Sequence, residues 1–222
     1  MADACQGDTQ RAAATRHTRI GLIGCLGFCA LSLLSYVTPL AVPLMVLVGL
    51  ALPLVWAWRT GEWETMGFRR RNLGAALAWG LGAGLVTSVI AVIVVQQRMV
   101  PPRLGLELAV GIPLWLLVAS PFQEFFFRGW LQSQWQRGMG KSLGLVVTAV
   151  VFTLWHYCWP LAGQTAVPLY TLQGAMATLA SGLVYGYCFQ RTGSIVASWL
   201  GHALAGVTFV CVGAGSFIGA LP

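Results

Sequence analysis

The sequence predicts an all-α membrane protein, a helical bundle of about seven transmembrane helices, with a range of six to eight, around a polar intramembrane cavity. Hydrophobic residues make up 57% of the chain and charged residues only 9%, which is far outside the composition of soluble proteins. The mean hydropathy is +0.75, and apolar runs long enough to cross a bilayer recur along the chain. The 13 basic residues fall mostly in the short segments between these runs, so the net charge of +7 does not indicate a nucleic-acid partner.

The first part of the chain is a polar tail over residues 1–19, which we expect in the cytoplasm, followed by a single transmembrane domain over 20–222. The apolar run 20–37 is interpreted as a signal anchor, because no small-residue motif typical of a cleavage site closes it. A second span is predicted over 40–58. The loop 59–72 after it carries four arginines, as cytoplasmic loops often do.

Two of the later spans contain glycine pairs, Gly80 with Gly84 and Gly182 with Gly186, at a spacing that lets another helix approach closely. The alternation of basic and non-basic loops predicts a cytoplasmic N-terminus and a C-terminus on the far side of the membrane. The later spans are predicted over residues 73–95, 108–131, 143–159, 169–189 and 195–217.

Four ionisable residues remain inside the predicted spans: Glu124, Arg128, His156 and His202. Glu124 and Arg128 are four residues apart and so share one helix face. A charge inside the bilayer costs about 2.5–3.5 kcal/mol on insertion scales, so such residues usually serve a site or a partner. Each residue alone could be structural, as an ion pair within one helix or a hydrogen bond between helices. Together, on three helices with almost no other charge, they predict one shared functional site.

These residue types suit the activation of water. A partly desolvated carboxylate can act as a general base, and a histidine can share the proton of the water or donate a proton to a leaving amine. A second histidine could stabilise a tetrahedral intermediate. Arg128 is expected to orient the carboxylate or to bind substrate carbonyls, since the guanidinium does not give up its proton.

The order of these residues resembles a known pattern. Glu124-x-x-x-Arg128, then Phe152-x-x-x-His156, then His202 is similar to the three motifs of the CAAX-protease and bacteriocin-processing (CPBP) family of glutamic intramembrane endopeptidases. The resemblance implies an all-helical membrane fold and peptide hydrolysis without a nucleophilic side chain. In that family, a pair of acidic residues and the middle histidine activate water. The last histidine and an asparagine four residues later bind the oxyanion.

The sequence departs from the family pattern at two positions. Gln123 stands where the family usually has the first of two glutamates, and an amide cannot take a proton. Three explanations are open: Glu124 takes over as the base, the protein is a natural pseudoenzyme, or the glutamine is an engineered substitution. Gly206 stands where the asparagine is expected, which removes one oxyanion donor. Losing such a donor can cost about 10²- to 10³-fold in rate.

Spans of this length place the site residues at different depths. On ideal helices of about 1.5 Å per residue, Glu124 and His202 lie roughly 10 Å from the cytoplasmic ends of their spans, and His156 lies nearer 20 Å. Aromatic residues are also concentrated near the motifs. Phe127, Phe152 and Trp155 could line an apolar substrate groove next to Gly206, although packing is the more common role of such residues.

Several other functions remain possible. Two histidines and one glutamate could hold a catalytic zinc ion, but no H-E-x-x-H spacing supports this, and we expect no metal or other cofactor. A rhomboid-type serine protease built on Ser181 and His202 leaves Glu124 and Arg128 unexplained. A proton relay in a transporter would predict repeats that the sequence lacks. A catalytically inactive relative that binds a membrane peptide, as an immunity or scaffold protein, is favoured by Gln123 and Gly206.

The expected partners are the lipid bilayer and a membrane-embedded peptide or protein tail as substrate. The short loops and the absence of organelle signals indicate a multi-pass protein of a bacterial inner membrane. The six cysteines show no metal-binding spacing and are interpreted as small apolar residues.

Overall fold

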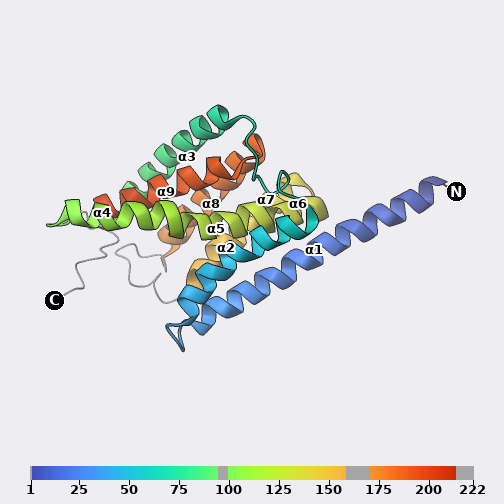
Figure 1. Cartoon of the computed structure of the whole chain (residues 1–222), viewed down its shortest axis with the longest axis horizontal. Coiled ribbons are helices and arrows are strands. Elements are labelled where there is room, and N and C mark those ends of the chain that lie inside the picture. Colours follow the sequence, from blue (N-terminus) through green and yellow to red (C-terminus); the bar gives the residue numbers. More distant parts are fainter. Residues whose placement is uncertain (1, 95–99, 159–170, 214–222) are drawn as a thin grey trace.

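The computed structural model describes residues 2–94, 100–158 and 171–213, and all of the regular elements in these ranges are helices (Figure 1). They are α1 (Ala2–Leu34), α2 (Ala41–Thr60), α3 (Leu73–Val94), α4 (Leu104–Leu114), η1 (Trp115–Ala119), α5 (Ser120–Glu124), η2 (Phe125–Gln132), α6 (Ser133–Met139), α7 (Lys141–Trp155), η3 (His156–Cys158), α8 (Leu172–Thr192) and α9 (Ile195–Cys211).

Five helical segments are long and apolar enough to cross a membrane, which confirms the predicted multi-pass helical bundle. Helix α9 is a shorter apolar helix, and α8 is 21 residues long. The tail expected over 1–19 continues α1 as one helix with the first span. The predicted span ends at residues 159, 169 and 217 lie outside the described residues. The five spanning segments are Gly7–Leu34, Ala41–Thr60, Leu73–Val94, Leu104–Met139 and Lys141–Cys158.

The fourth span is much longer than the predicted 108–131. Elements α4 to α6 follow one another without a break as a 36-residue rod, Leu104–Met139. Met139 lies 15 residues after Glu124, which corresponds to about 22 Å of helix, and His156 likewise lies 15 residues after Lys141. The predicted mismatch in depth between these two side chains was therefore wrong, because the helix of Glu124 ends later than its apolar pattern does.

The same correction applies to the other end of the rod. Glu107 stands just before the predicted span 108–131, but it lies in the first turn of α4 and is buried. It is thus a further ionisable residue inside a helix of membrane-spanning length.

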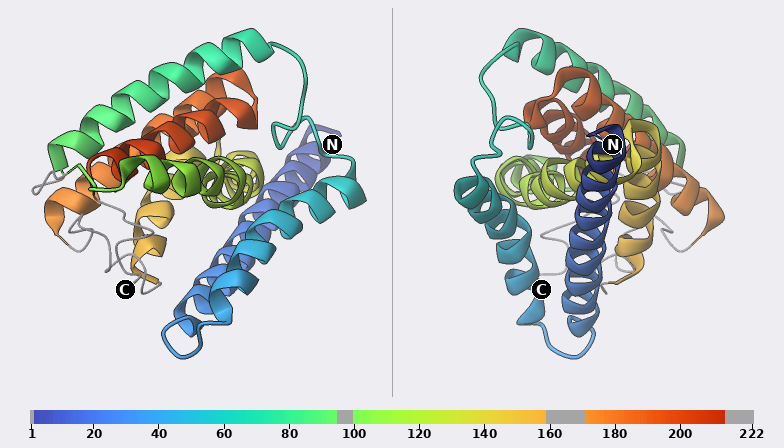
Figure 2. Two further views of the ribbon diagram at one scale, coloured as in Figure 1. Left: turned by 60° about the vertical axis from the view of Figure 1, so that its left-hand side comes forward. Right: turned by 90° about the vertical axis from the view of Figure 1, so that its right-hand side faces the viewer.

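The rod runs through the middle of the molecule. Helices α1 and α2 lie side by side along one flank, and α3 and α9 lie along the opposite flank (Figures 1 and 2). Helix α9 packs most extensively against α3 and also contacts α4 and α5. The rod therefore contacts both halves of the bundle, and the polar residues at its centre lie on the side of α9.

Aromatic side chains form the core between the rod and the first two helices. Phe126 stacks on Phe28 of α1, with ring centroids 4.0 Å apart, and Trp155 of α7 donates a hydrogen bond to Ser32. Glycines on α1 make room for this core, since a Cβ at Gly24 would lie 2.2 Å from the Trp130 ring. The core cluster contains Phe28, Met45, Met66, Phe122, Phe126, Phe127, Trp130, Leu131, Trp135, Phe152 and Trp155.

Both predicted glycine pairs mark close helix contacts. A Cβ at Gly80 would lie 3.0 Å from the Ala197 carbonyl of α9, so α3 and α9 approach with little side-chain volume between them. The second pair exposes backbone carbonyls of α8 to the rod. Arg128 donates to the oxygen of Gly182 at 3.2 Å, and Gln132 donates to the oxygen of Gly186 at 3.0 Å. Because both helices advance by four residues, the two bonds fix the register between η2 and α8.

The loop between α2 and α3 is tied to the end of the rod by an ion pair. Arg137 donates to both carboxylate oxygens of Glu62, at 2.6 and 2.9 Å, and Trp56 donates to the same carboxylate at 2.9 Å. The hydrogen bonds from Arg137 hold the pKa of Glu62 below its ordinary value. The carboxylate therefore binds a proton less readily in the folded state than in the unfolded state.

This ion pair should make part of the stability depend on pH. Its contribution is present above the ordinary carboxylate pKa and is lost as the pH falls through the lowered pKa of Glu62. Since the pair is partly exposed, Glu62→Gln should cost about 0.2–1 kcal/mol at pH 7. Melting curves in detergent from pH 7 to pH 3 would measure this, with the exposed Glu64→Gln as the control. A gap between wild type and Glu62→Gln that stays constant over this range would contradict the prediction.

Candidate active site

Glu124 is the centre of a buried polar cluster. Its side chain is fully buried at the last residue of α5. One carboxylate oxygen, Oε1, lies 3.2 Å from a guanidinium nitrogen of Arg128 and 2.8 Å from Nδ1 of His202. The other oxygen, Oε2, is buried and has no hydrogen-bond partner in the described part of the chain. One side of the carboxylate is therefore held in place, and the other side is free to accept a proton.

Arg128 is positioned by helix α8 as well as by Glu124. It is fully buried, and its guanidinium lies over the Phe152 ring, 4.0 Å from the centroid, while donating to the Gly182 carbonyl. A buried charge needs a partner of opposite sign and further hydrogen bonds. Arg128 has both, because Gly182 lets the backbone of α8 come close. It is thus the counterion of Glu124.

His202 joins α9 to the carboxylate. Its ring stacks on Tyr185 of α8, with centroids 4.9 Å apart and an angle of 15° between the planes. Because a carboxylate oxygen only accepts, Nδ1 of His202 carries the proton that it donates to Glu124. Ser198, one turn earlier on α9, also faces the carboxylate, but its hydroxyl donates to the Ile195 carbonyl at 3.2 Å.

His156 lies at the end of α7 on the other side of Phe152. Its Nδ1 is 2.7 Å from the Phe152 carbonyl oxygen, so Nδ1 carries a proton and Nε2 of the neutral ring is an acceptor. The Phe152 ring contacts both imidazoles, with centroid distances of 4.6 Å to His156 and 5.9 Å to His202. The structure therefore brings the four ionisable residues of the sequence motifs together around one phenylalanine. Their catalytic roles remain predictions.

The two positions that depart from the motif pattern also lie at this cluster. Gln123 is buried beside Glu124, and its side-chain oxygen has no hydrogen-bond partner among the described residues. A Cβ at Gly206 would lie 2.0 Å from Cδ2 of Trp115. Position 206 therefore has no room for a side chain, since the Trp115 indole already fills that volume.

The three aromatic residues expected to line a substrate groove, Phe127, Phe152 and Trp155, belong to the core cluster. Phe127 and Trp155 are almost completely buried and contact each other, with centroids 5.3 Å apart. Both rings also contact the ring of Phe152. Substrate binding by these aromatic residues stays a prediction. The polar cavity around the site also stays a prediction.

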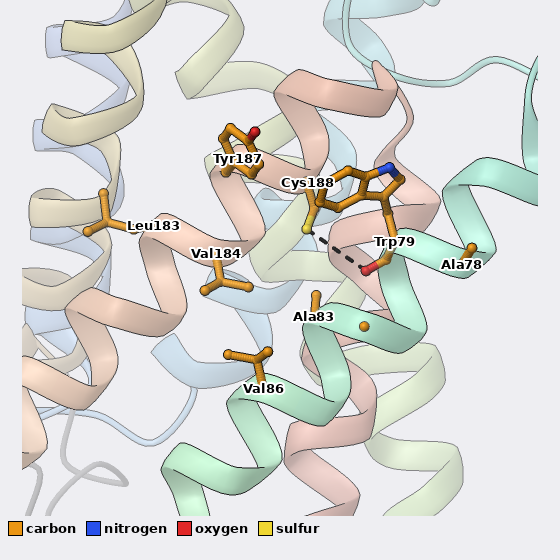
Figure 3. A pocket seen from close by; sticks show the side chains of 9 residues that line it. Ala78, Trp79, Ala83, Val86, Leu183, Val184, Tyr187 and Cys188 are labelled. Carbon is orange, nitrogen blue, oxygen red and sulfur yellow. Dashed lines mark hydrogen bonds between the residues drawn. The ribbon is translucent and has the colours of Figure 1, made fainter.

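A groove of about 650 Å³ is present elsewhere, between α3 and α8 (Figure 3). Its lining is apolar, and Cys188 lies in it within 3.9 Å of the Trp79 carbonyl oxygen. None of the four motif residues lines this groove. It opens on the side of the bundle where α3 and α8 carry exposed apolar side chains, as expected of a surface in contact with lipid.

Sequence reasoning missed three residues of the cluster: Tyr185, Ser198 and Trp115. Ser198 could have been found, because it is four residues before His202 and so on the same helix face. Tyr185 lies between the two glycines of α8, which already indicated a close contact. Nothing in the local pattern connects Trp115 to Gly206, which is far away in the sequence.

Comparison with known families agrees with this geometry. The family described as "Type II CAAX prenyl endopeptidase Rce1-like" matches residues 105–208. Residues 105–208 are thus similar to this family, which supports the resemblance to CAAX proteases carried by the three motifs. The Rce1-like region covers nearly all of the rod together with α7, α8 and most of α9, so it contains every residue of the cluster. No curated protein and no solved structure matches the chain.

The match to the Rce1-like family supports a membrane protease as the kind of function, with a peptide or protein in the membrane as the kind of substrate. As for a metal, the described residues contain no group of three or more His, Cys, Asp and Glu side chains placed to hold one ion. Glu124 and His202 instead face each other through a hydrogen bond.

Proposed function

We propose that this protein is an intramembrane endopeptidase that cleaves a membrane-associated peptide or a C-terminal tail with water activated by Glu124 and His156. One observation carries the proposal: the Glu124 carboxylate is held on one oxygen by Arg128 and His202, while its other oxygen has no partner in the described chain. A carboxylate used only for structure would be expected to have both oxygens satisfied.

The first step is the attack of water on the peptide carbonyl carbon. Oε2 of Glu124 accepts one proton of the water as the oxygen bonds to carbon, and the carbonyl π electrons move to the carbonyl oxygen. Nε2 of His156 accepts a hydrogen bond from the same water and orients it, since its proton is held on Nδ1 by the Phe152 carbonyl. No covalent enzyme intermediate forms.

The second step is the collapse of the tetrahedral intermediate. The C–N bond breaks, and the proton taken by Glu124 passes to the leaving nitrogen, so the enzyme returns to its starting state. His202 donates Nδ1–H to Glu124 throughout. When it is protonated, its Nε2–H is available to the oxyanion as well.

The absence of a carboxylate at Gln123 fits this assignment. Arg128 is the cation that forms an ion pair with Glu124, and a second carboxylate at position 123 would compete for the same charge. With an amide there, Glu124 is the ionised group. Glu124 thus takes the part that the family resemblance gives to the first of two glutamates.

The family name refers to CAAX prenyl endopeptidases, which favours a C-terminal tail as the substrate of this chain too. We place the protein in a bacterial inner membrane with its N-terminus in the cytoplasm. The support is the charge distribution, because most of the arginines gather at one end of the bundle, including Arg59 in the last turn of α2 and Arg137 near the end of α6.

A second candidate function is a catalytically inactive member that binds a membrane peptide. Gln123 and the filled volume at Gly206 favour it, because both remove groups that the family pattern would use for catalysis. This candidate keeps the peptide site but predicts no hydrolysis.

Cleavage assays in detergent separate the candidates. Purified wild type and Gln123→Glu should be incubated with a panel of fluorogenic membrane tails, each with and without a zinc chelator. We expect wild type to cleave at least one tail at a rate that the chelator leaves unchanged. Cleavage by Gln123→Glu alone would support the inactive member, and loss of wild-type activity with chelator would support a zinc hydrolase.

A further inference from the structure

We propose that Trp115 replaces the carboxamide missing at position 206, closing the site beside His202 and donating its indole N–H to the oxygen that becomes negative during hydrolysis. The inference rests on the proposed function and names a further residue for that reaction.

The first observation is that the Trp115 side chain of the rod occupies the volume that a side chain at position 206 of α9 would fill. A Cβ at Gly206 would lie 2.0, 2.2 and 2.6 Å from Cδ2, Cε3 and Cε2 of Trp115. These atoms belong to the indole ring, which therefore occupies the place where a side chain at 206 would begin. The indole nitrogen is bonded to Cε2, so its N–H lies close to the volume that a carboxamide would fill.

The second observation is that this position faces the catalytic cluster. Gly206 follows His202 by one helical turn on α9, and the Trp115 ring centroid lies 5.9 Å from that of His202. Trp115 is half-buried. Its indole N–H has no hydrogen-bond partner within the described chain, whereas those of Trp155 and Trp199 both do.

The third observation explains how Trp115 is held there. It is the first residue of η1, a π-helical segment of the rod, and π turns often occur at functional sites. At the next residue the rod is tied to α9, since the indole of Trp199 donates to the Leu116 carbonyl at 2.7 Å. This bond fixes the rod against α9 close to the point where Trp115 meets Gly206.

Chemically, the indole needs only to donate a hydrogen bond. As water adds to the carbonyl carbon, the carbonyl oxygen gains negative charge, and a preplaced N–H stabilises it without transferring its proton. His202 and Trp115 would then flank the oxyanion from two helices. The protein would keep the two-donor arrangement implied by the family resemblance while using a different side chain.

The test compares Trp115→Phe, which removes the N–H and keeps most of the ring, with Trp58→Phe at an exposed tryptophan as the matched control. We expect Trp115→Phe to lower kcat by about 10- to 100-fold with little change in KM, somewhat less than the loss of a strong oxyanion donor. The control should match wild type. A Trp115→Phe variant that cleaves as well as wild type would overturn the donor role.

A binding measurement separates failure of this inference from failure of the proposed function. The probes are an N-acyl hexapeptide with one peptide bond replaced by a phosphinate and the same peptide with a methylene there. Wild type should prefer the phosphinate, and Trp115→Phe should lose about 10-fold of that preference. A preference that Trp115→Phe keeps overturns the donor role alone. Absence of both cleavage and preference in wild type overturns the proposed function and the donor role together.

A reciprocal exchange tests the volume argument. Gly206→Asn should lower the melting temperature, because its Cβ would collide with the indole. Adding Trp115→Ala should restore the melting temperature and raise cleavage above that of Trp115→Ala alone, since an amide donor would again be present. Gly206→Asn with unchanged stability in the wild-type background would contradict the packing shown here.

Discussion

Glu124→Gln is expected to reduce peptide cleavage by about 10³-fold or more. The amide keeps the shape of the side chain but cannot accept the proton of water, and a positioned general base contributes about 10²- to 10⁴-fold. Rates on the tail that wild type cleaves fastest would measure the loss, with the exposed Glu64→Gln as the control. A loss of less than 10-fold would move the role of base to Nε2 of His156.

Because Glu124→Gln also leaves Arg128 without its counterion, a second variant separates chemistry from folding. Glu124→Asp keeps the negative charge and the pairing with Arg128 but withdraws the carboxylate by one methylene. It should melt near the wild-type temperature and still lose about 10²-fold in rate, because proton transfer requires close positioning. Equal activity of Glu124→Asp and wild type would argue against direct proton transfer to Glu124.

Arg128→Met is expected to destabilise the folded protein by about 3–5 kcal/mol, since breaking a buried ion pair leaves a charge without compensation. The side chain is fully buried, and its partners are Glu124, the Gly182 carbonyl and the Phe152 ring. Reversible unfolding in mixed micelles would measure the cost. Arg191→Met, at an exposed arginine, is the matched control and should change stability by less than about 0.5 kcal/mol.

The double variant Glu124→Gln/Arg128→Met sharpens this prediction. With both charges removed, no buried charge of the pair is left unpaired, so the double variant should be more stable than Arg128→Met alone. If the two single costs simply add, the ion pair does not account for the stability of this region.

Much of the fold could be predicted because the apolar runs are long and the basic residues mark their ends. The glycine pairs on α3 and α8 were also informative, since a missing Cβ has a direct consequence for helix approach. The convergence of Glu124, His156 and His202 followed from the cost of ionisable residues in a membrane. An ionisable side chain inside a membrane needs a polar partner, so its helix must turn that side chain toward a neighbouring helix that carries one.

Other features could not be predicted, for identifiable physical reasons. The rod extends to Met139 through polar residues that read as a loop, because helical hydrogen bonds and contacts with α1 and α7 continue beyond the apolar pattern. Glu107 lies beside Pro101 and Pro102 and therefore resembled a loop residue. Tyr185 and Trp115 carry no charge, so their positions beside His202 follow from packing between helices, which local sequence does not specify.

The π-helical segments on either side of α5 have a consequence for how the motifs should be counted. Each residue of an α-helix turns the side-chain direction by about 100°, and a π turn holds roughly one residue more than an α turn. The angular phase between Trp115 and Glu124 therefore depends on η1, and an α turn with the same number of residues in place of Trp115–Ala119 would rotate one against the other by about that angle. A relative with an α turn here would place the residues that correspond to Trp115 and Glu124 on the same two helix faces with one residue fewer between them. The angular position of these side chains around the helix axis therefore defines the site better than their separation in the sequence.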